Sequence, residues 1–328
     1  MTRYDLLAIG NALVDVVAPA SDAFLEAEGL PKGAMSLVDG ERAHALYQRM
    51  SAGVETSGGT AANTSVGLAS FGGRSAFIGK VADDTLGEVF AHDLRAAGVA
   101  FCAEPLKGGV ATGRCLVNVT PDAERTMCTF LGASVELTVA DVSAAEVGAA
   151  SVLYLEGYLF DPGEARRAFI KAARLARAAG RRIAFSLSDC FLVERHREAL
   201  LTFVESEVDI LFANEAEILS LFPGTQKREA LQRAGALAEI VAVTFGARGS
   251  MILGSGSSIE TPADPVEEVV DTTGAGDQYA AGFLFGLARD RPLAACGALG
   301  SLAAGEVITH YGPRPQRSLR DMATAQGF

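Results

Sequence analysis

The chain alternates between two kinds of segment, and this alternation limits its fold more than any other feature of the sequence. Six apolar runs, each about as long as one buried strand, occur at residues 4–10, 75–79, 152–156, 183–187, 208–213 and 240–245. Stretches of helical periodicity lie between the later runs. One of them, residues 164–179, is rich in alanine and arginine and precedes Gly180 as an expected C-cap. The alternation predicts an α/β fold with a doubly wound, mostly parallel sheet and helices on both faces.

Two regions, residues 14–38 and 99–130, interrupt this alternation. In the second region, segments 114–120 and 125–130 flank a turn-forming Pro-Asp-Ala-Glu sequence, which predicts an antiparallel hairpin. We interpret the two regions as a small β-sheet lid over a site at the carboxyl ends of the core strands. The alternative is an edge meander that covers nothing. No repeat or linker divides the chain, so residues 1–328 are predicted to form a single domain.

The composition narrows the possible partners. The 328 residues include 28 Lys and Arg against 40 Asp and Glu, a net charge of −12. Binding to nucleic acid or to an anionic membrane requires a basic face, so we expect neither partner. The five cysteines form no Cys-x-x-Cys pair, which predicts reduced thiols and no cysteine metal site. The sequence shows no signal peptide or membrane-length apolar run, so we expect a cytoplasmic protein.

The most informative motif is Asp271-Thr-Thr-Gly-Ala-Gly-Asp277, which precedes an apolar helical stretch. Its glycines allow close backbone approach, and the amides of residues 274–277 would face outward at a helix N-terminus. Such amides, together with the helix dipole, suit a phosphoryl group in transfer. Asp277 is either a helix cap or a general base. We favour the base, because a carboxylate beside a bound anion is repulsive unless it takes a proton from an attacking alcohol.

A second glycine segment occupies residues 57–73, where Gly58 and Gly59 precede small residues and Asn63. Small residues let the backbone approach a ligand, and the Asn63 amide offers a donor and acceptors to a diol. The structural alternative is a loop followed by tight helix packing. The chain shows no P-loop, because Arg74 stands where the first glycine before Gly79-Lys80 would be. The dinucleotide spacing Gly-x-Gly-x-x-Gly does not follow the first strand either.

Together, the two glycine segments resemble the signatures of the ribokinase/PfkB family of carbohydrate and nucleoside kinases. Residues 58–73 resemble the first signature and residues 271–277 the second. Between them, Asn214-Glu-Ala-Glu217 is similar to the family's Asn-x-x-Glu motif, and residues 243–249 are similar to its nucleotide-binding strand and turn. The resemblance covers essentially the whole chain and implies a ribokinase-like fold and an ATP-dependent kinase.

The resemblance also implies roles for individual residues. Asp277 is the expected catalytic base. Three residues are expected to bind the γ-phosphate through their amides: Gly274, Ala275 and Gly276. Asn214 and Glu217 are expected to organise water around Mg²⁺ and the phosphates, with Glu217 reaching the metal through water. A capping pair without a metal role is the alternative for these two residues.

Further contacts with the two substrates and a cation follow from the same resemblance. The ATP side is implied to be lined by Thr244, Gly246 and Gly249. Acceptor hydroxyls are implied to contact Asp15, Gly58, Gly59 and Asn63, although Asp15 by itself is equally readable as a solvated loop residue. Asp271 and Thr273 occur where many relatives bind a monovalent cation, usually K⁺, with carbonyls from a loop here near residues 311–313. Because not every relative depends on that ion, K⁺ is an optional cofactor beside ATP and Mg²⁺.

The identity of the acceptor is less strongly indicated by the sequence than the kinase activity is. Segments 4–15, 32–39 and 120–127 resemble the adenosine-kinase-like branch, which implies transfer of the γ-phosphoryl group to the 5′-OH of adenosine, giving AMP. Thr273 departs from this branch, where Asn is common. Four aromatic residues are candidates for a purine pocket, although their apolar surroundings favour core positions: Phe101, Phe130, Tyr158 and Phe160. Arg114 and Arg125 are candidates for acceptor contact, although solvated edge positions are commoner for arginines on such strands.

Two alternatives stay open. A sugar kinase of the same family would phosphorylate ribose, fructose or a similar acceptor. A non-catalytic nucleotide-binding regulator would keep the fold without the chemistry, but Asp277 beside an unbroken glycine turn argues against it. The predicted mechanism is in-line transfer with Asp277 as base and with a lid that excludes water. Both a monomer and a homodimer are compatible with the sequence.

Overall fold

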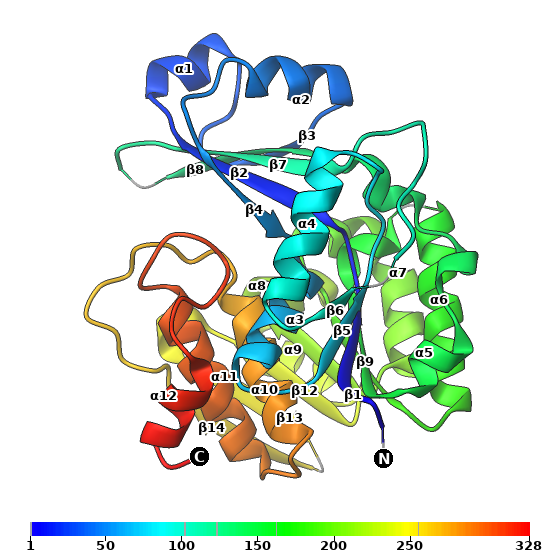
Figure 1. The fold of residues 1–328 in the computed structure, drawn as a ribbon. Coiled ribbons are helices and arrows are strands. Elements are labelled where there is room, and N and C mark those ends of the chain that lie inside the picture. The colour runs from blue at the N-terminus through cyan, green and yellow to red at the C-terminus, as the bar shows by residue number, and fades with distance from the viewer. Residues whose placement is uncertain (1, 102, 123, 162, 255) are drawn as a thin grey trace.

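The computed structural model describes residues 2–101, 103–122, 124–161, 163–254 and 256–328. Its strands form a nine-stranded sheet with the order β14-β13-β12-β11-β10-β9-β1-β5-β6 and a separate five-stranded sheet (Figure 1). Seven strands make up the parallel part of the large sheet: β1 (Tyr4–Ile9), β5 (Ser75–Ile78), β6 (Ala100–Phe101), β9 (Ala150–Glu156), β10 (Arg182–Ser186), β11 (Ile210–Asn214) and β12 (Ile240–Thr244). The predicted α/β architecture is therefore confirmed.

Antiparallel strands β13 (Ser250–Gly254) and β14 (Ser257–Thr261) close one edge of the large sheet. The six apolar runs of the sequence correspond to strands β1, β5, β9, β10, β11 and β12. These strands are buried on both faces, which explains why they read as continuous apolar runs rather than as alternating patterns.

Helices cover both faces of the large sheet. One apolar cluster contains Leu7 and Ile9 of β1 and packs under helices α5 (Ala144–Gly148), α6 (Gly163–Ala178), α7 (Cys190–Glu207), α8 (Glu215–Leu221) and α9 (Lys227–Ala234). A second cluster contains Leu6 and Ala8 and packs under α3 (Thr60–Ser70), α4 (Thr85–Ala96), α10 (Ala275–Leu287) and α11 (Leu293–Val307). Neighbouring residues of β1 enter opposite clusters because successive side chains of a strand point to opposite faces.

The remaining helical segments are short. Helix α12 (Leu319–Ala325) packs with α11 in a smaller apolar cluster. The 3₁₀ turns are η1 (Gly132–Glu136), η2 (Val139–Asp141), η3 (Gly157–Phe160) and η4 (Gly246–Arg248). The predicted helix 164–179 corresponds to α6, and Gly180 follows it with φ 65°, in agreement with its predicted role near the helix end.

The five-stranded sheet has the order β3-β8-β7-β2-β4. Its strands are β2 (Leu13–Pro19), β3 (Met35–Leu37), β4 (Val54–Gly58), β7 (Gly113–Val119) and β8 (Arg125–Phe130). β7 and β8 form the predicted antiparallel hairpin. Helices α1 (Asp22–Ala27) and α2 (Gly40–Tyr47) lie on the side of this sheet that faces away from the large sheet (Figure 1).

The membership of the small sheet differs from the prediction at two places. Residues 100–101 were assigned to it, but they form β6 and pair with β5 at the edge of the large sheet. β4 was left outside, but it pairs with β2 as an edge strand. Its sequence Val-Glu-Thr-Ser-Gly has no apolar alternation, because only Ser57 and Gly58 at its end are buried. Pairing with a distant strand, rather than a local pattern, creates β4.

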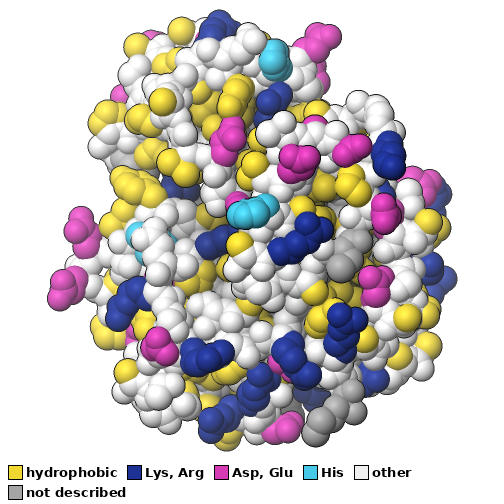
Figure 2. Space-filling view, viewed as in Figure 1, with side chains coloured by type: hydrophobic (Ala, Val, Ile, Leu, Met, Phe, Trp, Pro, Cys, Tyr) yellow, Lys and Arg dark blue, Asp and Glu magenta, His cyan; other side chains and the backbone are white. Residues whose placement is uncertain are grey.

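The charge of the chain is not gathered in one acidic patch on the face that Figure 2 shows. Lys and Arg side chains gather toward the lower end of this face, while Asp and Glu side chains are scattered around it. Among the residues that the structure describes, no helix is both long enough and apolar enough to cross a bilayer.

Candidate active site

The glycine turn before α10 has the geometry of an anion-binding turn. Gly274 caps the helix in the left-handed region, with φ 78° and ψ −2°. A Cβ atom on Gly274 would lie 2.6 Å from Pro313 Cα, so both conformation and space require glycine. Within the described part of the chain, the amides of Gly274, Gly276 and Asp277 find no acceptor, whereas Ala275 N donates to Thr272 O at 3.2 Å. The free amides point to an anion as their partner.

A cavity of about 260 Å³ lies in front of this turn. It brings together seven residues that the sequence singled out: Asn214, Glu217, Thr244, Gly274, Ala275, Gly276 and Asp277. Thr60 also lines it, as do Ser186, Ser188 and Phe212 near the carboxyl ends of β10 and β11. The cavity therefore lies at the edge of the parallel sheet where the topology predicts a site.

Asp277 occupies the first turn of α10 and is partly buried. Its Oδ2 accepts a hydrogen bond from Asn63 Nδ2 at 3.0 Å. The pKa of Asp277 is raised to about 7, chiefly by burial and also by the negative charges of Glu156 and Asp15, against the lowering effect of the Asn63 hydrogen bond. A carboxylate with a pKa near neutrality is suited to accept a proton and to release it again.

Glu156 is a buried carboxylate beside the site that the sequence analysis did not single out. It ends β9 and accepts hydrogen bonds from Asn11 Nδ2 and Ala61 N, each at 2.9 Å. Burial raises its pKa to about 7. Its position directly after an apolar strand is a signal that was present in the sequence, because carboxyl ends of parallel strands meet at one edge of a sheet.

The residues expected to contact the acceptor gather where β2 and β4 meet the start of α3. A Cβ atom on Gly58 would lie 2.2 Å from Asp15 Oδ2, so this glycine lets the carboxylate sit against the backbone. Gly59 has φ 97°, and a Cβ atom there would lie 2.2 Å from Asn11 O. Burial raises the pKa of Asp15 to about 6, although Arg314 and Arg125 lower it. Asp15 thus lies in strand β2 against Gly58 rather than in a solvated loop.

Arg314 was not predicted, and it completes this part of the site. Its Nε donates to Asn63 Oδ1 at 3.3 Å, and its Nη1 donates to Ser57 Oγ. Its Nη2 is buried without a partner among the described residues. Asn63 is therefore engaged at both ends of its amide, by Arg314 and by Asp277, whereas the sequence analysis expected a free amide for a diol. No local signal in the sequence marks this contact, because Arg314 lies on a loop 251 residues from Asn63.

Asn214 and Glu217 form a capping box at the start of α8. Asn214 N and Nδ2 donate to the two Glu217 carboxylate oxygens at 2.9 and 2.8 Å, and Glu217 N donates to Asn214 Oδ1 at 2.8 Å. The two residues therefore do cap the helix, and both also line the cavity, so capping does not exclude a further role. Burial raises the pKa of Glu217 to about 7. Among the described residues, no three His, Cys, Asp or Glu side chains cluster in a way that could hold a metal directly.

The three residues predicted for the ATP side take different positions. Thr244 ends β12 and lines the cavity. Gly246 and Gly249 shape the turn after that strand, with φ 60° and 84°, and neither belongs to the cavity lining. A Cβ atom on Gly249 would lie 2.1 Å from Thr261 O, so this glycine is required by the packing of β13 and β14.

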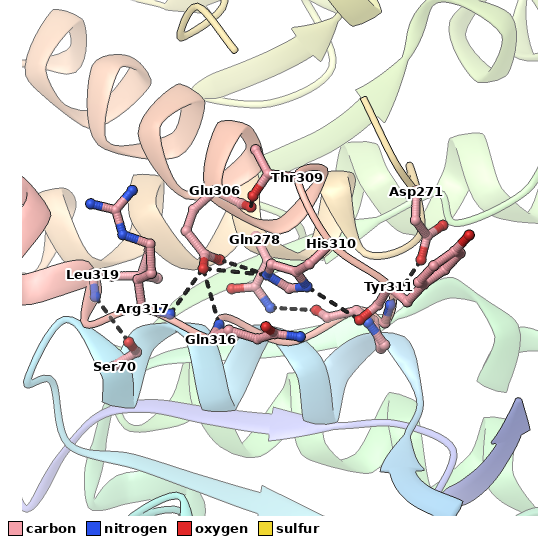
Figure 3. A network of polar contacts seen from close by, with 12 residues as sticks. Ser70, Asp271, Gln278, Glu306, Thr309, His310, Tyr311, Gln316, Arg317 and Leu319 are labelled. Atoms are coloured by element: carbon pink, nitrogen blue, oxygen red, sulfur yellow. Dashed lines mark hydrogen bonds and ion pairs between the residues drawn. The ribbon is translucent and has the colours of Figure 1, made fainter. Parts of the chain in front are cut away.

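Residues 308–318 form a loop beside the glycine turn, and Figure 3 shows how it is held. The buried carboxylate of Glu306 accepts hydrogen bonds from Gln316 N and Arg317 N at 3.0 and 2.9 Å and contacts the His310 ring. Gln278 Nε2 donates to Pro313 O at 2.9 Å. This anchoring places Pro313 against Gly274 and carries Arg314 into the acceptor side of the site.

The aromatic candidates divide into two pairs. Phe101 and Phe160 are buried in the two large apolar clusters, as their surroundings in the sequence favoured. Phe130 and Tyr158 are partly exposed. The burial of Tyr158 and the nearby charges of Asp189 and Glu156 raise its pKa, which places this ring beside the carboxylates of the site.

The two arginines of the small sheet that the sequence singled out, Arg114 and Arg125, also differ. Arg114 lies over the ring of Tyr47, with its guanidinium carbon 5.6 Å from the ring centre. The edge position favoured for Arg125 is wrong. Its guanidinium is mostly buried and contacts Asp271 and Thr273 of the glycine turn, because β8 begins beside that turn. A contact between residues 146 positions apart leaves no local pattern in the sequence.

Comparison with known proteins gives a consistent family. The model of the pfkB family of carbohydrate kinases matches residues 37–319. The solved structure of adenosine kinase from Sinorhizobium meliloti shares 49% identity and a TM-score of 0.94, covering 99% of this chain and 100% of that one. A probable sugar kinase from Rhizobium etli CFN 42 shares 47% identity and the same TM-score, covering 100% and 99%.

A curated relative, the cytidine kinase of Thermococcus kodakarensis, is 37% identical over 42% of this chain. The match spans about half of that relative, 51% of its length. These similar proteins thus differ in the acceptor that their names state, although all are described as kinases.

Proposed function

The chain belongs to the pfkB family of carbohydrate kinases, and from this premise we propose that it phosphorylates adenosine at the 5′-hydroxyl, with ATP as donor. The family establishes an ATP-dependent kinase that acts on an alcohol group of a nucleoside or sugar. The observation that carries the catalytic proposal is the juxtaposition of free amides at the start of α10 with Asp277 in one cavity. The likeness to the S. meliloti adenosine kinase over nearly the full chain favours adenosine among the acceptors.

In the proposed reaction, the acceptor oxygen attacks the γ-phosphorus of ATP in line with the leaving oxygen of ADP. The new oxygen–phosphorus bond forms as the bond to ADP breaks, and the hydroxyl proton passes to the Asp277 carboxylate. The amides of Gly274, Gly276 and Asp277 donate hydrogen bonds to the transferring group and stabilise its developing charge. Asn63, held by Arg314, orients the Asp277 carboxylate toward the acceptor.

The residues present fit a metal held through water. Glu217 lines the cavity, and each of its carboxylate oxygens keeps a lone pair beyond its bond to Asn214. Glu217 and Asn214 would therefore hold the water shell of Mg²⁺. That ion supplies charge neutralisation at the phosphates of ATP.

The five-stranded sheet is the proposed lid. Its strand β8 reaches the glycine turn through Arg125, and its strand β4 reaches the loop 308–318 through Ser57. A sheet held over the acceptor side would keep water from the phosphoryl group, so that the acceptor alcohol is phosphorylated in preference to hydrolysis of ATP.

A sugar acceptor is the second candidate. Two of the four aromatic candidates are buried in the core. Of the remaining rings, Phe130 ends strand β8 of the small sheet, whereas Tyr158 lies in the turn η3 that follows β9. A purine needs a large flat apolar surface, whereas a sugar needs mainly hydroxyl contacts such as those of Asp15. The similarity to the probable sugar kinase of R. etli supports the same alternative.

A panel of acceptors tests the proposal. ADP release would be measured with adenosine, cytidine, ribose and fructose, with 5′-deoxyadenosine as the control that lacks the accepting hydroxyl. We expect adenosine to have a kcat/KM at least about 10²-fold above either sugar, because a site built for the base loses those contacts with a bare sugar. We also expect 5′-deoxyadenosine to inhibit without releasing ADP. A higher kcat/KM for ribose or fructose would overturn the nucleoside assignment, and silence with every acceptor would overturn the kinase.

A further inference from the structure

The small sheet sends one charged side chain into the large unit beside the glycine turn. Arg125 lies on β8, and its guanidinium forms an ion pair with Asp271 and a hydrogen bond with Thr273 Oγ1. The Arg125 side chain is 13% exposed and that of Asp271 is 1% exposed. Both partners are therefore removed from solvent, where an ion pair is screened much less than at the surface.

These partners are the two residues that the family resemblance associates with a monovalent cation, and their surroundings do not fit one. Asp271 Oδ1 accepts from Thr273 N at 3.0 Å, and Oδ2 accepts from Arg125. Oδ2 also accepts from Gly312 N of the loop at 2.9 Å (Figure 3). An alkali cation binds to oxygen lone pairs, as other hard cations do. Here two N–H donors take up both lone pairs of Oδ2, and a third N–H group is directed at Oδ1.

The loop that would supply carbonyl ligands is also engaged. The carbonyl of Pro313 accepts a hydrogen bond from Gln278 Nε2 at 2.9 Å, and the carbonyl of Tyr311 lies 3.2 Å from His310 Nδ1. Gln278 is completely buried and follows the glycine turn directly, so its amide holds the loop in place from inside the protein. The donor set thus presents hydrogen-bond donors where a cation would need free oxygens.

We propose that the guanidinium of Arg125 takes the place of the monovalent cation, so that phosphoryl transfer by this chain does not require K⁺. This inference rests on the proposed phosphotransferase function. Asp271 lies in the turn that receives the phosphoryl group, and an unneutralised carboxylate there would repel that group. The positive side chain of Arg125 neutralises the Asp271 carboxylate, so that no ion from solution is needed. It acts through Asp271 and the turn, so it is a positioning residue.

Neutralisation of Asp271 by a side chain of the small sheet has a consequence that neutralisation by a free ion would not have. A cation from solution binds whether or not the small sheet is seated, but Arg125 reaches Asp271 only when β8 lies over the glycine turn. Neutralisation of the turn is therefore coupled to the position of the small sheet. The site becomes favourable for the phosphoryl group when the acceptor side is covered, which ties charge compensation to exclusion of water.

Wild-type protein tests the inference first. Phosphotransfer rates and Tm would be measured with K⁺, Na⁺ or tetramethylammonium as the only monovalent cation, at constant ionic strength. We expect rates within about twofold of one another and the same Tm in all three, because no site remains for a specific ion. A saturable activation by K⁺ of about tenfold or more, or a rise of Tm specific to K⁺, would overturn the proposal.

Variants of Arg125 then test whether Asp271 can bind a monovalent cation once the guanidinium is removed. In Arg125→Ala, we expect the rate in tetramethylammonium to fall about 10²-fold. We also expect K⁺ to raise both the rate and the Tm, the latter by about 2–4 °C, because Asp271 is then free to bind a cation. Arg125→Lys keeps the charge and is expected to stay indifferent to K⁺. Arg49→Ala, at an exposed arginine just after α2, is the matched control and should behave as wild type.

The outcomes separate this inference from the proposed function. If Arg125→Ala shows no response of Tm to K⁺, Arg125 is an ordinary ion-pair partner and the replacement idea fails. If no acceptor supports ADP release in any cation, the proposed function fails, while the response of Tm to K⁺ still decides the inference. Should Arg125→Ala not fold, the wild-type cation series and Arg125→Lys decide the question by themselves.

Discussion

Burial of carboxylates is the dominant feature of the site at the scale of single residues. Burial raises the pKa of Asp277, Glu156 and Glu217 to about 7 and that of Asp15 to about 6. Each of these groups is held among protein atoms with few opposite charges, so its ionised form is disfavoured. The same arrangement provides a base that is partly deprotonated at neutral pH. The burial that makes these carboxylates suitable for proton transfer therefore lowers the stability of the folded protein.

Asp277→Asn tests the base directly. We expect kcat to fall by about 10²–10⁴-fold while the Kd for ATP stays within about twofold, because the amide cannot accept the proton but leaves the anion turn unchanged. In wild type, the rate should rise with pH through about 7 as Asp277 loses its proton. Asp83→Asn, at an exposed aspartate, is the control. Full activity of the Asp277→Asn enzyme would remove the base assignment.

Arg314→Gln tests the contact that holds Asn63. We expect the KM for the acceptor to rise about tenfold or more with little change in the KM for ATP, because Asn63 and Asp15 lose their partner on the acceptor side only. Arg314 lowers the pKa of Asp15, so the acidic limb of the acceptor kcat/KM profile should move to higher pH in the variant. Arg314→Lys should recover part of the effect. Arg317→Gln, on an exposed side chain of the same loop, is the control, and an equal effect there would refute the role.

At the scale of elements, the N-terminus of α10 depends on the loop 308–318 that packs against it. The loop is fixed from three sides, by Glu306, by Gln278 and by Asp271, and it returns that support by placing Pro313 against Gly274. Helix α10 is buried along most of its length, which fixes the direction of its free amides. The anion turn is therefore a property of two packed elements and not of the glycines alone.

Gly274→Ala tests that packing. We expect the free energy of unfolding to fall by about 2–3 kcal/mol, because alanine is strained at φ 78° and its Cβ would lie 2.6 Å from Pro313 Cα. The KM for ATP should rise in the same variant. Gly180→Ala is the matched control, since it has φ 65° with nothing within 4 Å, and it should cost about 1 kcal/mol. Equal losses measured by urea denaturation would show that backbone conformation alone matters.

At the scale of the whole molecule, polar contacts link the small sheet to the large unit around the site. Arg125 pairs with Asp271, and Ser57 of β4 contacts both Arg314 and Asp93. The apolar cluster of the small sheet, formed by Val16, Leu46, Leu116 and Cys128, lies under α2, whereas Val14 of β2 packs into an apolar cluster of the large unit. Polar and apolar contacts therefore both hold the small sheet against the large unit.

The raised pKa values also predict how stability varies with pH. An acid whose folded pKa lies above its unfolded value binds more protons in the native state, so stability falls as pH rises between about 4 and 7. The cost is absent below that window and complete above it. Asp277→Asn should therefore raise Tm by about 2–4 °C at pH 8 and leave it nearly unchanged at about pH 4, where the cost has barely begun. Calorimetry on both proteins checks this, and an equal shift at both pH values would exclude a titrating Asp277 as the cause.

The sequence by itself determined the fold class, the parallel strands, the β7–β8 hairpin and the family. These features are encoded locally: apolar runs identify strands, periodicity identifies α6, and the motif of residues 271–277 combines an anion turn with an acid. Capping of α8 by Asn214 and Glu217 is local for the same reason, since the two residues are three positions apart.

Only the tertiary structure decided which side chains complete the site. Arg314 and Asn63 are 251 residues apart, Asn63 and Asp277 are 214 apart, and Arg125 and Asp271 are 146 apart. Strand β4 likewise exists only through its pairing with β2. Such contacts depend on how the elements pack against one another. Local propensity carries no information about that packing. The partner of a buried charged residue can therefore be identified only in the folded structure.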